Sequence, residues 1–97
     1  MEKRVVITGL GAITPVGIGK ENFYNALLEG KSGIGPITRF DASDYATRIA
    51  GEVKDFDITQ YGVDKKEARR MDRSVEFAIG AAVLAADDAK LALDEED

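Results

Sequence analysis

Cysteine and histidine are both absent from the 97 residues of this chain. The missing cysteine excludes disulfides, thiolate nucleophiles and cysteine-based metal sites within these residues. The missing histidine removes the usual general base at neutral pH and the commonest metal ligand. We therefore assign no catalytic, cofactor-binding or metal-binding residue to this chain.

Long apolar runs and an excess of positive charge are also missing. The longest apolar run, residues 77–86, is too short to span a bilayer, and the run after Arg4 is too short for a signal-peptide core. The formal net charge of -5 argues against general nucleic-acid binding. We expect a cytoplasmic protein without a membrane or nucleic-acid partner. A chain of this length is one small domain or a piece of a larger one.

Two stretches predict strands. Residues 5–7 are a continuous β-branched run, typical of a central parallel strand that is covered on both faces. Residues 47–54 alternate, with Ile49 and Val53 on one side and Arg48 and Glu52 on the other. This alternation predicts a strand with one solvated face.

Three further stretches predict helices. Residues 20–29 carry apolar pairs four positions apart and end at Gly30, a plausible helix stop. Residues 31–44 lack periodicity and predict a loop. A short charged helix is expected at residues 64–70, and Asp72 is placed to cap a longer helix that runs to about Leu93.

The last predicted helix is apolar on all sides between residues 77 and 86. A surface helix has one apolar stripe, whereas a helix that is apolar all round is buried on most sides. Two strands and one amphipathic helix do not suffice to wrap it. The sequence therefore predicts that these residues pack against more protein than the chain itself contains.

The opening "RVVITGLGAITPVGIG", residues 4–19, places glycines after a strand-like run, as in dinucleotide-binding proteins. The third glycine of the Gly-x-Gly-x-x-Gly motif is replaced by Thr14, and the helix begins only after Gly19, so its N-terminus would not face a pyrophosphate. Nucleotide binding stays open as an alternative. The other interpretation is that the glycines let the backbone turn and pack closely against other backbone.

The same opening resembles the N-terminal signature of β-ketoacyl-[acyl carrier protein] synthases, the condensing enzymes of fatty-acid elongation. Two further segments match in the same order: "FDASDYATRIAGEVKDF", residues 40–56, and "KKEARRMDRSVEFAIGAA", residues 65–82. The combination is more similar to synthase II than to the ketosynthase domains of modular polyketide synthases. Ketosynthases of dissociated polyketide systems remain an alternative.

This resemblance implies an α/β fold, the N-terminal portion of the layered αβαβα thiolase-like architecture. It also implies that residues 1–97 are a fragment of a ketosynthase domain rather than a complete domain. Family members catalyse a decarboxylating Claisen condensation with a cysteine and two histidines, which this chain lacks. We expect the chain alone to be inactive, with the remainder of the synthase as its partner. The intact enzyme would be a homodimer without metal or nucleotide cofactor, and its substrates would be carried on phosphopantetheine.

The segment "DKKEARRMDR", residues 64–73, is a local exception to the acidic composition. If it is helical, Lys66, Arg69, Arg70 and Arg73 fall on one face. Such a face suits an acidic partner, because it speeds encounter and sets orientation. The segment is short and lacks interleaved aromatic residues, which argues against a nucleic-acid role.

The resemblance implies that the basic segment docks the acyl carrier protein, which is strongly acidic. The matching positions are Lys65, Lys66, Arg69 and Arg70. One alternative is a solvated helix with local ion pairs, for example Glu67 with Arg70. Another is a stand-alone, non-catalytic module that binds the carrier protein.

Overall fold

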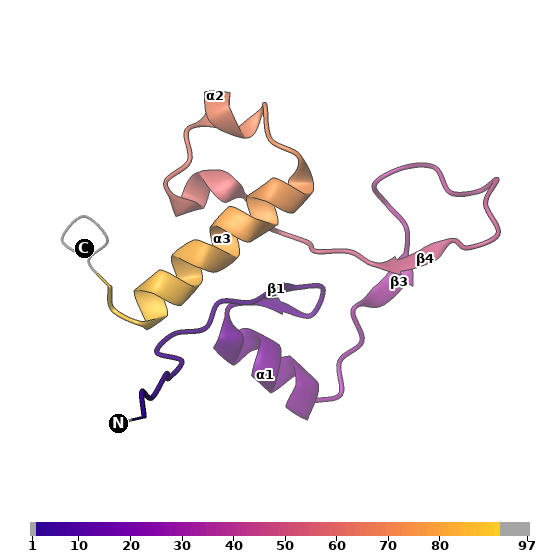
Figure 1. The fold of residues 1–97 in the computed structure, drawn as a ribbon. Coiled ribbons are helices and arrows are strands. Elements are labelled where there is room, and N and C mark those ends of the chain that lie inside the picture. Colours follow the sequence, from indigo (N-terminus) through magenta and orange to yellow (C-terminus); the bar gives the residue numbers. More distant parts are fainter. Residues whose placement is uncertain (1, 92–97) are drawn as a thin grey trace. The chain divides into compact units, whose positions relative to one another are not determined.

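The computed structural model describes residues 2–91, which contain short helices, short strands and one longer helix near the C-terminal end of this range (Figure 1). The elements in chain order are β1 (Ile13–Thr14), β2 (Gly17–Ile18), α1 (Lys20–Leu28), β3 (Ile34–Pro36), β4 (Ile49–Gly51), the 3₁₀ helix η1 (Ile58–Tyr61), α2 (Lys65–Ala68) and α3 (Arg73–Asp88). The chain forms two compact units. One joins residues 2–12 to residues 57–91, and the other is Ile13–Phe56.

The Ile13–Phe56 unit begins with a tight antiparallel hairpin of β1 and β2, in which Ile13 pairs with Ile18. Helix α1 follows at once and ends as predicted. Gly30 has a φ of 71°, and the N–H groups of Gly30 and Lys31 donate to the carbonyls of Leu27 and Ala26. This is the left-handed helix stop that glycine permits without steric cost, so the predicted end of the helix is confirmed.

The predicted apolar stripe of α1 does not form a core. Ala26 is buried, whereas Tyr24, Leu27 and Leu28 are all more than half exposed. Within this unit α1 packs against the two-residue strand β2, which is too small to cover both sides of the helix. The spacing of apolar residues therefore predicted the position of the helix correctly, but it did not predict which of its side chains are buried.

Strands β3 and β4 form a second antiparallel hairpin, with Gly35 opposite Ala50. The prediction of an uninterrupted loop over residues 31–44 is wrong at β3, because pairing with β4 stabilises a strand despite the local loop signals. The predicted strand at residues 47–54 is confirmed only for Ile49–Gly51. The side of the strand that carries the apolar side chains is not buried, since Ile49 is 57% exposed.

The carboxylate of Glu52, which directly follows β4, binds the segment that follows β3. Glu52 accepts hydrogen bonds from the Thr38 hydroxyl at 2.8 Å and from the backbone N–H groups of Thr38 and Arg39. The hydroxyl bond is the main reason that the pKa of Glu52 lies below its ordinary value. The bonds anchor the chain just beyond β3.

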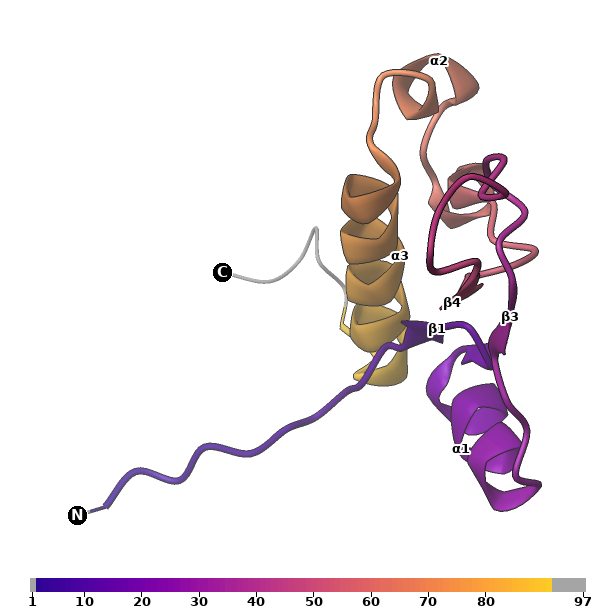
Figure 2. The same ribbon diagram turned by 90° about the vertical axis from the view of Figure 1, so that its right-hand side faces the viewer.

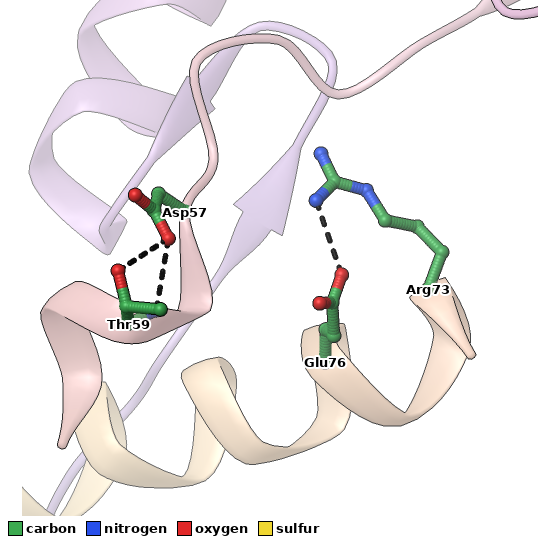
Figure 3. A network of polar contacts seen from close by, with 4 residues as sticks. All are labelled: Asp57, Thr59, Arg73 and Glu76. Carbon is green, nitrogen blue, oxygen red and sulfur yellow. Dashed lines mark hydrogen bonds and ion pairs between the residues drawn. The ribbon is translucent and has the colours of Figure 1, made fainter. Parts of the chain in front are cut away.

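In the other unit, Asp57 caps η1 as Figure 3 shows. Its carboxylate accepts hydrogen bonds from the Thr59 hydroxyl at 2.6 Å and the Thr59 N–H at 3.0 Å. These bonds satisfy donors that the first turn of a helix leaves free. Helix α3 packs against η1, where Ile58 is buried.

Helix α3 is shorter than predicted. It ends at Asp88, after which Lys90 adopts a φ of 58°. The N–H groups of Lys90 and Leu91 donate to the carbonyls of Asp87 and Ala86, which closes the helix five residues before the predicted end. Asp72 occupies the N-cap position as predicted, but its side chain forms no capping hydrogen bond.

The predicted central strand at residues 5–7 is absent. The segment is extended but unpaired, and Figure 2 shows it leading away from α3. Val5, Val6 and Ile7 are 95%, 66% and 81% exposed. A parallel strand needs hydrogen-bonded neighbours, and within residues 2–91 both sheets are antiparallel hairpins formed elsewhere in the chain.

The glycines that follow this segment pack on α3. A Cβ atom at Gly11 would overlap the Ala81 carbonyl oxygen and lie 2.7 Å from the Ala85 nitrogen. A Cβ at Gly9 would meet Ala85 and Ala89 in the same way. Between the glycines, the Leu10 N–H donates to the Asp88 carboxylate at 2.9 Å. The prediction that these glycines allow close backbone packing is confirmed.

Helix α3 is incompletely covered, as its all-apolar sequence predicts. Gly80 is its buried residue, whereas Phe77, Ile79, Val83 and Leu84 are all only partly buried. An apolar hollow of about 400 Å³ runs beside its alanines and is lined in part by Ile7 and Leu91. The hollow and the apolar side chains of α3 have the composition of a protein core, but the described residues do not cover them completely.

We expect the 97-residue chain, expressed alone, to self-associate at micromolar concentration. Contiguous exposed apolar surface of this kind promotes association, and residues 5–7 also present an unpaired, β-branched backbone. Sedimentation velocity across a concentration series should show mass that rises with concentration. A clean monomer with one cooperative unfolding transition would contradict this expectation.

Candidate functional site

The basic segment forms a short helix followed by a turn. Helix α2 begins after Asp64, and the Met71 N–H donates to the Ala68 carbonyl as the chain turns toward Asp72. The four candidate binding residues all have exposed side chains: Lys65, Lys66, Arg69 and Arg70. The structure thus places them where a partner can reach them.

The four cations do not form one uniform surface. Lys66 and Arg70 line a hollow of about 220 Å³ together with Asp64 and Glu67. Lys65 and Arg69 are outside this lining. The hollow therefore combines both signs of charge.

Lys65 has an acidic neighbour that the sequence did not reveal. The pKa of Asp57 is lowered chiefly by the hydrogen bonds from Thr59, and the positive charge of Lys65 adds to this effect. Asp57 is eight positions earlier in the chain, at the start of η1. Contact between α2 and η1 brings the two charges near one another, and no helical spacing predicts it.

The prediction that Arg73 continues the basic face is wrong. Helix α2 ends at Ala68, and Arg73 is the first residue of α3. Its Nη1 atom is 3.2 Å from Glu76 Oε1, and its guanidinium is 5.0 Å from the centre of the Phe77 ring. Figure 3 shows Arg73 turned toward Glu76 along α3. The turn between the helices breaks the spacing on which the continuous face depended.

The alternative of a local ion pair between Glu67 and Arg70 also differs from the structure. Both side chains lie within the described residues and line the same hollow, but no ion pair joins them. Arg73 forms an ion pair with Glu76, and Lys31 forms one with Glu29. The charges around the hollow are therefore not neutralised by direct contact with each other.

The glycine-rich opening does not form a phosphate cradle. The β1–β2 hairpin separates Gly11 from helix α1, which starts only at Lys20. Dinucleotide binding requires a helix that begins within the glycine motif, whereas α1 begins only after the hairpin, so the local order of elements does not fit it. Across residues 2–91, the structure shows no cluster of acidic side chains that could hold a metal ion. None of the helices described is long and apolar enough to cross a membrane.

Comparison with known proteins gives consistent matches over almost the whole chain. Residues 2–97 match the family model described as "Beta-ketoacyl synthase, N-terminal domain". The 3-oxoacyl-[acyl-carrier-protein] synthase 2 of Synechocystis sp. is 60% identical over 94 residues, which cover 97% of this chain and 22% of the relative. The protein of the same name from Vibrio harveyi is 50% identical over 95 residues, covering 98% and 23%.

A solved structure agrees with these relatives. The ishigamide ketosynthase/chain length factor superposes with a TM-score of 0.82 at 38% identity, covering 93% of this chain and 22% of that one. The chain thus spans less than a quarter of the length of the relatives that it matches. The family match and this superposition show that the chain belongs to the β-ketoacyl synthases, as part of their α/β, thiolase-like N-terminal domain.

Proposed function

We propose that this chain is the N-terminal part of a longer 3-oxoacyl-[acyl-carrier-protein] synthase of type II. The observation that carries the proposal is the 60% identity with the Synechocystis synthase, spread over 94 residues. Identity at this level across so much of the chain supports the same enzyme rather than a distant relative. In this proposal, residues 1–97 are not a complete domain, and the rest of the ketosynthase covers the apolar surface of α3 and residues 5–7. The intact enzyme would be a homodimer.

The proposed reaction is a decarboxylating condensation. An acyl group moves from the carrier-protein thiol to an enzyme cysteine, which forms a new thioester and releases the carrier. Malonyl-carrier protein then loses CO₂, and its α-carbon attacks the acyl thioester, which frees the enzyme thiolate and forms the 3-oxoacyl product. The cysteine and the two histidines that support these steps must come from outside these 97 residues. Substrates arrive on phosphopantetheine, so no metal or separate cofactor is required.

The role we assign to this chain is to bind the carrier protein through Lys65, Lys66, Arg69 and Arg70. Their exposure on and just after α2 supports this role, because each is available to an approaching partner. An acidic carrier protein is steered toward exposed positive charge, which raises the association rate more than the affinity.

A second candidate is the ketosynthase of a dissociated polyketide system. The similarity to the ishigamide ketosynthase/chain length factor favours it. Identity with that protein is 38%, compared with 60% for the Synechocystis synthase, so we prefer the fatty-acid enzyme.

The test starts from the native protein, recovered from its source cells with an antibody against this segment. We expect an intact mass well above 10.5 kDa and release of CO₂ when the protein is given acyl- and malonyl-carrier protein. The 97-residue chain alone should give no product above background, because it has no nucleophilic cysteine. A native mass of 10.5 kDa would contradict the enzyme proposal and favour a stand-alone binding module.

A further inference from the structure

The side chains that line the hollow beside α2 carry no net formal charge. The hollow is lined by two cations, Lys66 and Arg70, and two carboxylates, Asp64 and Glu67. All four side chains are exposed, and their charges cancel. The positive excess of the surface therefore comes from Lys65 and Arg69, which are outside the hollow.

Glu67 is available to repel an acidic partner. Within residues 2–91 its side chain forms no hydrogen bond or ion pair, so neither Lys66 nor Arg70 holds its charge in direct contact. A partner whose carboxylates approach Lys66 and Arg70 must bring them close to Glu67 as well. Like charges placed opposite one another at an interface weaken binding and exclude wrong orientations.

We propose that Glu67 is a repulsive, specificity-determining residue that limits how tightly the carrier protein is held. This inference rests on the proposed function, in which two carrier proteins dock in succession. The first carrier must leave after it delivers its acyl group, because the malonyl-carrier protein needs the same surface. A carboxylate within the cationic surface keeps docking reversible at each step.

The test measures the affinity of the full-length protein for the source organism's own acyl carrier protein, bearing phosphopantetheine but no acyl group. Glu67→Gln should lower the Kd about two- to fivefold, the size of effect that one exposed charge pair contributes. The difference should shrink at about 1 M salt, where the Debye length is only about 3 Å. Because Glu67 is exposed and has no hydrogen-bonding partner to lose, the substitution should leave folding intact.

The matched control is Asp87→Asn, which changes the net charge by the same amount. Asp87 is exposed and lies near the far end of α3, roughly 20 Å along the helix axis from Arg73. Figures 1 and 2 both show α2 at the Arg73 end of this helix. At that separation the charge is screened at physiological salt, so the control should leave the Kd unchanged.

The possible results distinguish a failure of the role of Glu67 from a failure of the proposed carrier-protein binding. If the unmodified protein does not bind the carrier, both fail. If it binds, and charge reversal at Arg69 and Arg70 weakens binding while Glu67→Gln does not tighten it, only the role of Glu67 is wrong. Equal tightening by Glu67→Gln and Asp87→Asn would show a general effect of net charge and would also overturn the role of Glu67.

Discussion

Replacing Gly11 by alanine should lower the free energy of unfolding by about 3 kcal/mol, at the upper end of the usual cost of overpacking. The added Cβ would overlap the Ala81 carbonyl oxygen and approach the Ala85 nitrogen to 2.7 Å. Both are backbone atoms of α3, which cannot move aside as the end of a flexible side chain can. The segment must therefore leave the helix, which also strains the hydrogen bond from Leu10 to Asp88. Denaturant unfolding of the full-length protein measures the loss.

Gly35→Ala is the matched control for this prediction. A Cβ atom at Gly35 would meet nothing within 4 Å, and its backbone does not require glycine. We expect a change within about 0.5 kcal/mol, because alanine also reduces the entropy of the unfolded chain. If the two substitutions have equal effects, the close contact between Gly11 and α3 does not stabilise the protein.

Reversing two charges with Arg69→Glu and Arg70→Glu should raise the Kd for acyl carrier protein about tenfold or more. The double substitution removes two attractive charges and introduces two repulsive ones, and each exposed pair contributes about 0.2–1 kcal/mol. Most of the change should appear in the association rate, with a weaker dependence on salt. Stopped-flow binding at two salt concentrations measures both quantities.

The charge-preserving variant Arg69→Lys with Arg70→Lys provides the control for docking. It keeps both positive charges and loses only the planar donor geometry of arginine. We expect its Kd to stay within about threefold of the original, which is well below the tenfold or greater change expected for charge reversal. Unchanged binding after charge reversal would show that the carrier docks elsewhere.

The parts of the fold that local signals control were predicted from the sequence. Gly30 ends α1 by adopting a left-handed conformation, and this depends only on its immediate neighbours. The strand at residues 5–7 was not predicted correctly, because a strand exists only when another strand pairs with it. The early end of α3 was missed because Lys90, rather than glycine, takes the left-handed position.

The candidate site shows the same division. The exposure of Lys65, Lys66, Arg69 and Arg70 followed from their charge. Arg73 was grouped with them because helical spacing assumes an unbroken helix, whereas the chain turns before Asp72. The proximity of Lys65 to Asp57 and the mixed charge of the hollow depend on how separate elements pack, and no spacing rule contains that information.

The contact of Gly9 and Gly11 with α3 also imposes an order of events during synthesis. Leu10 and its hydrogen-bonding partner Asp88 are 78 positions apart. At a translation rate of roughly 5–20 residues per second, about 4–16 seconds pass between the synthesis of Leu10 and the synthesis of Asp88. Throughout that time Gly9, Leu10 and Gly11 lack the helix on which they pack in the folded structure. The chain from Gly9 to Gly11 therefore stays without these contacts until α3 has been made, and slower translation of residues 11–88 would lengthen that interval.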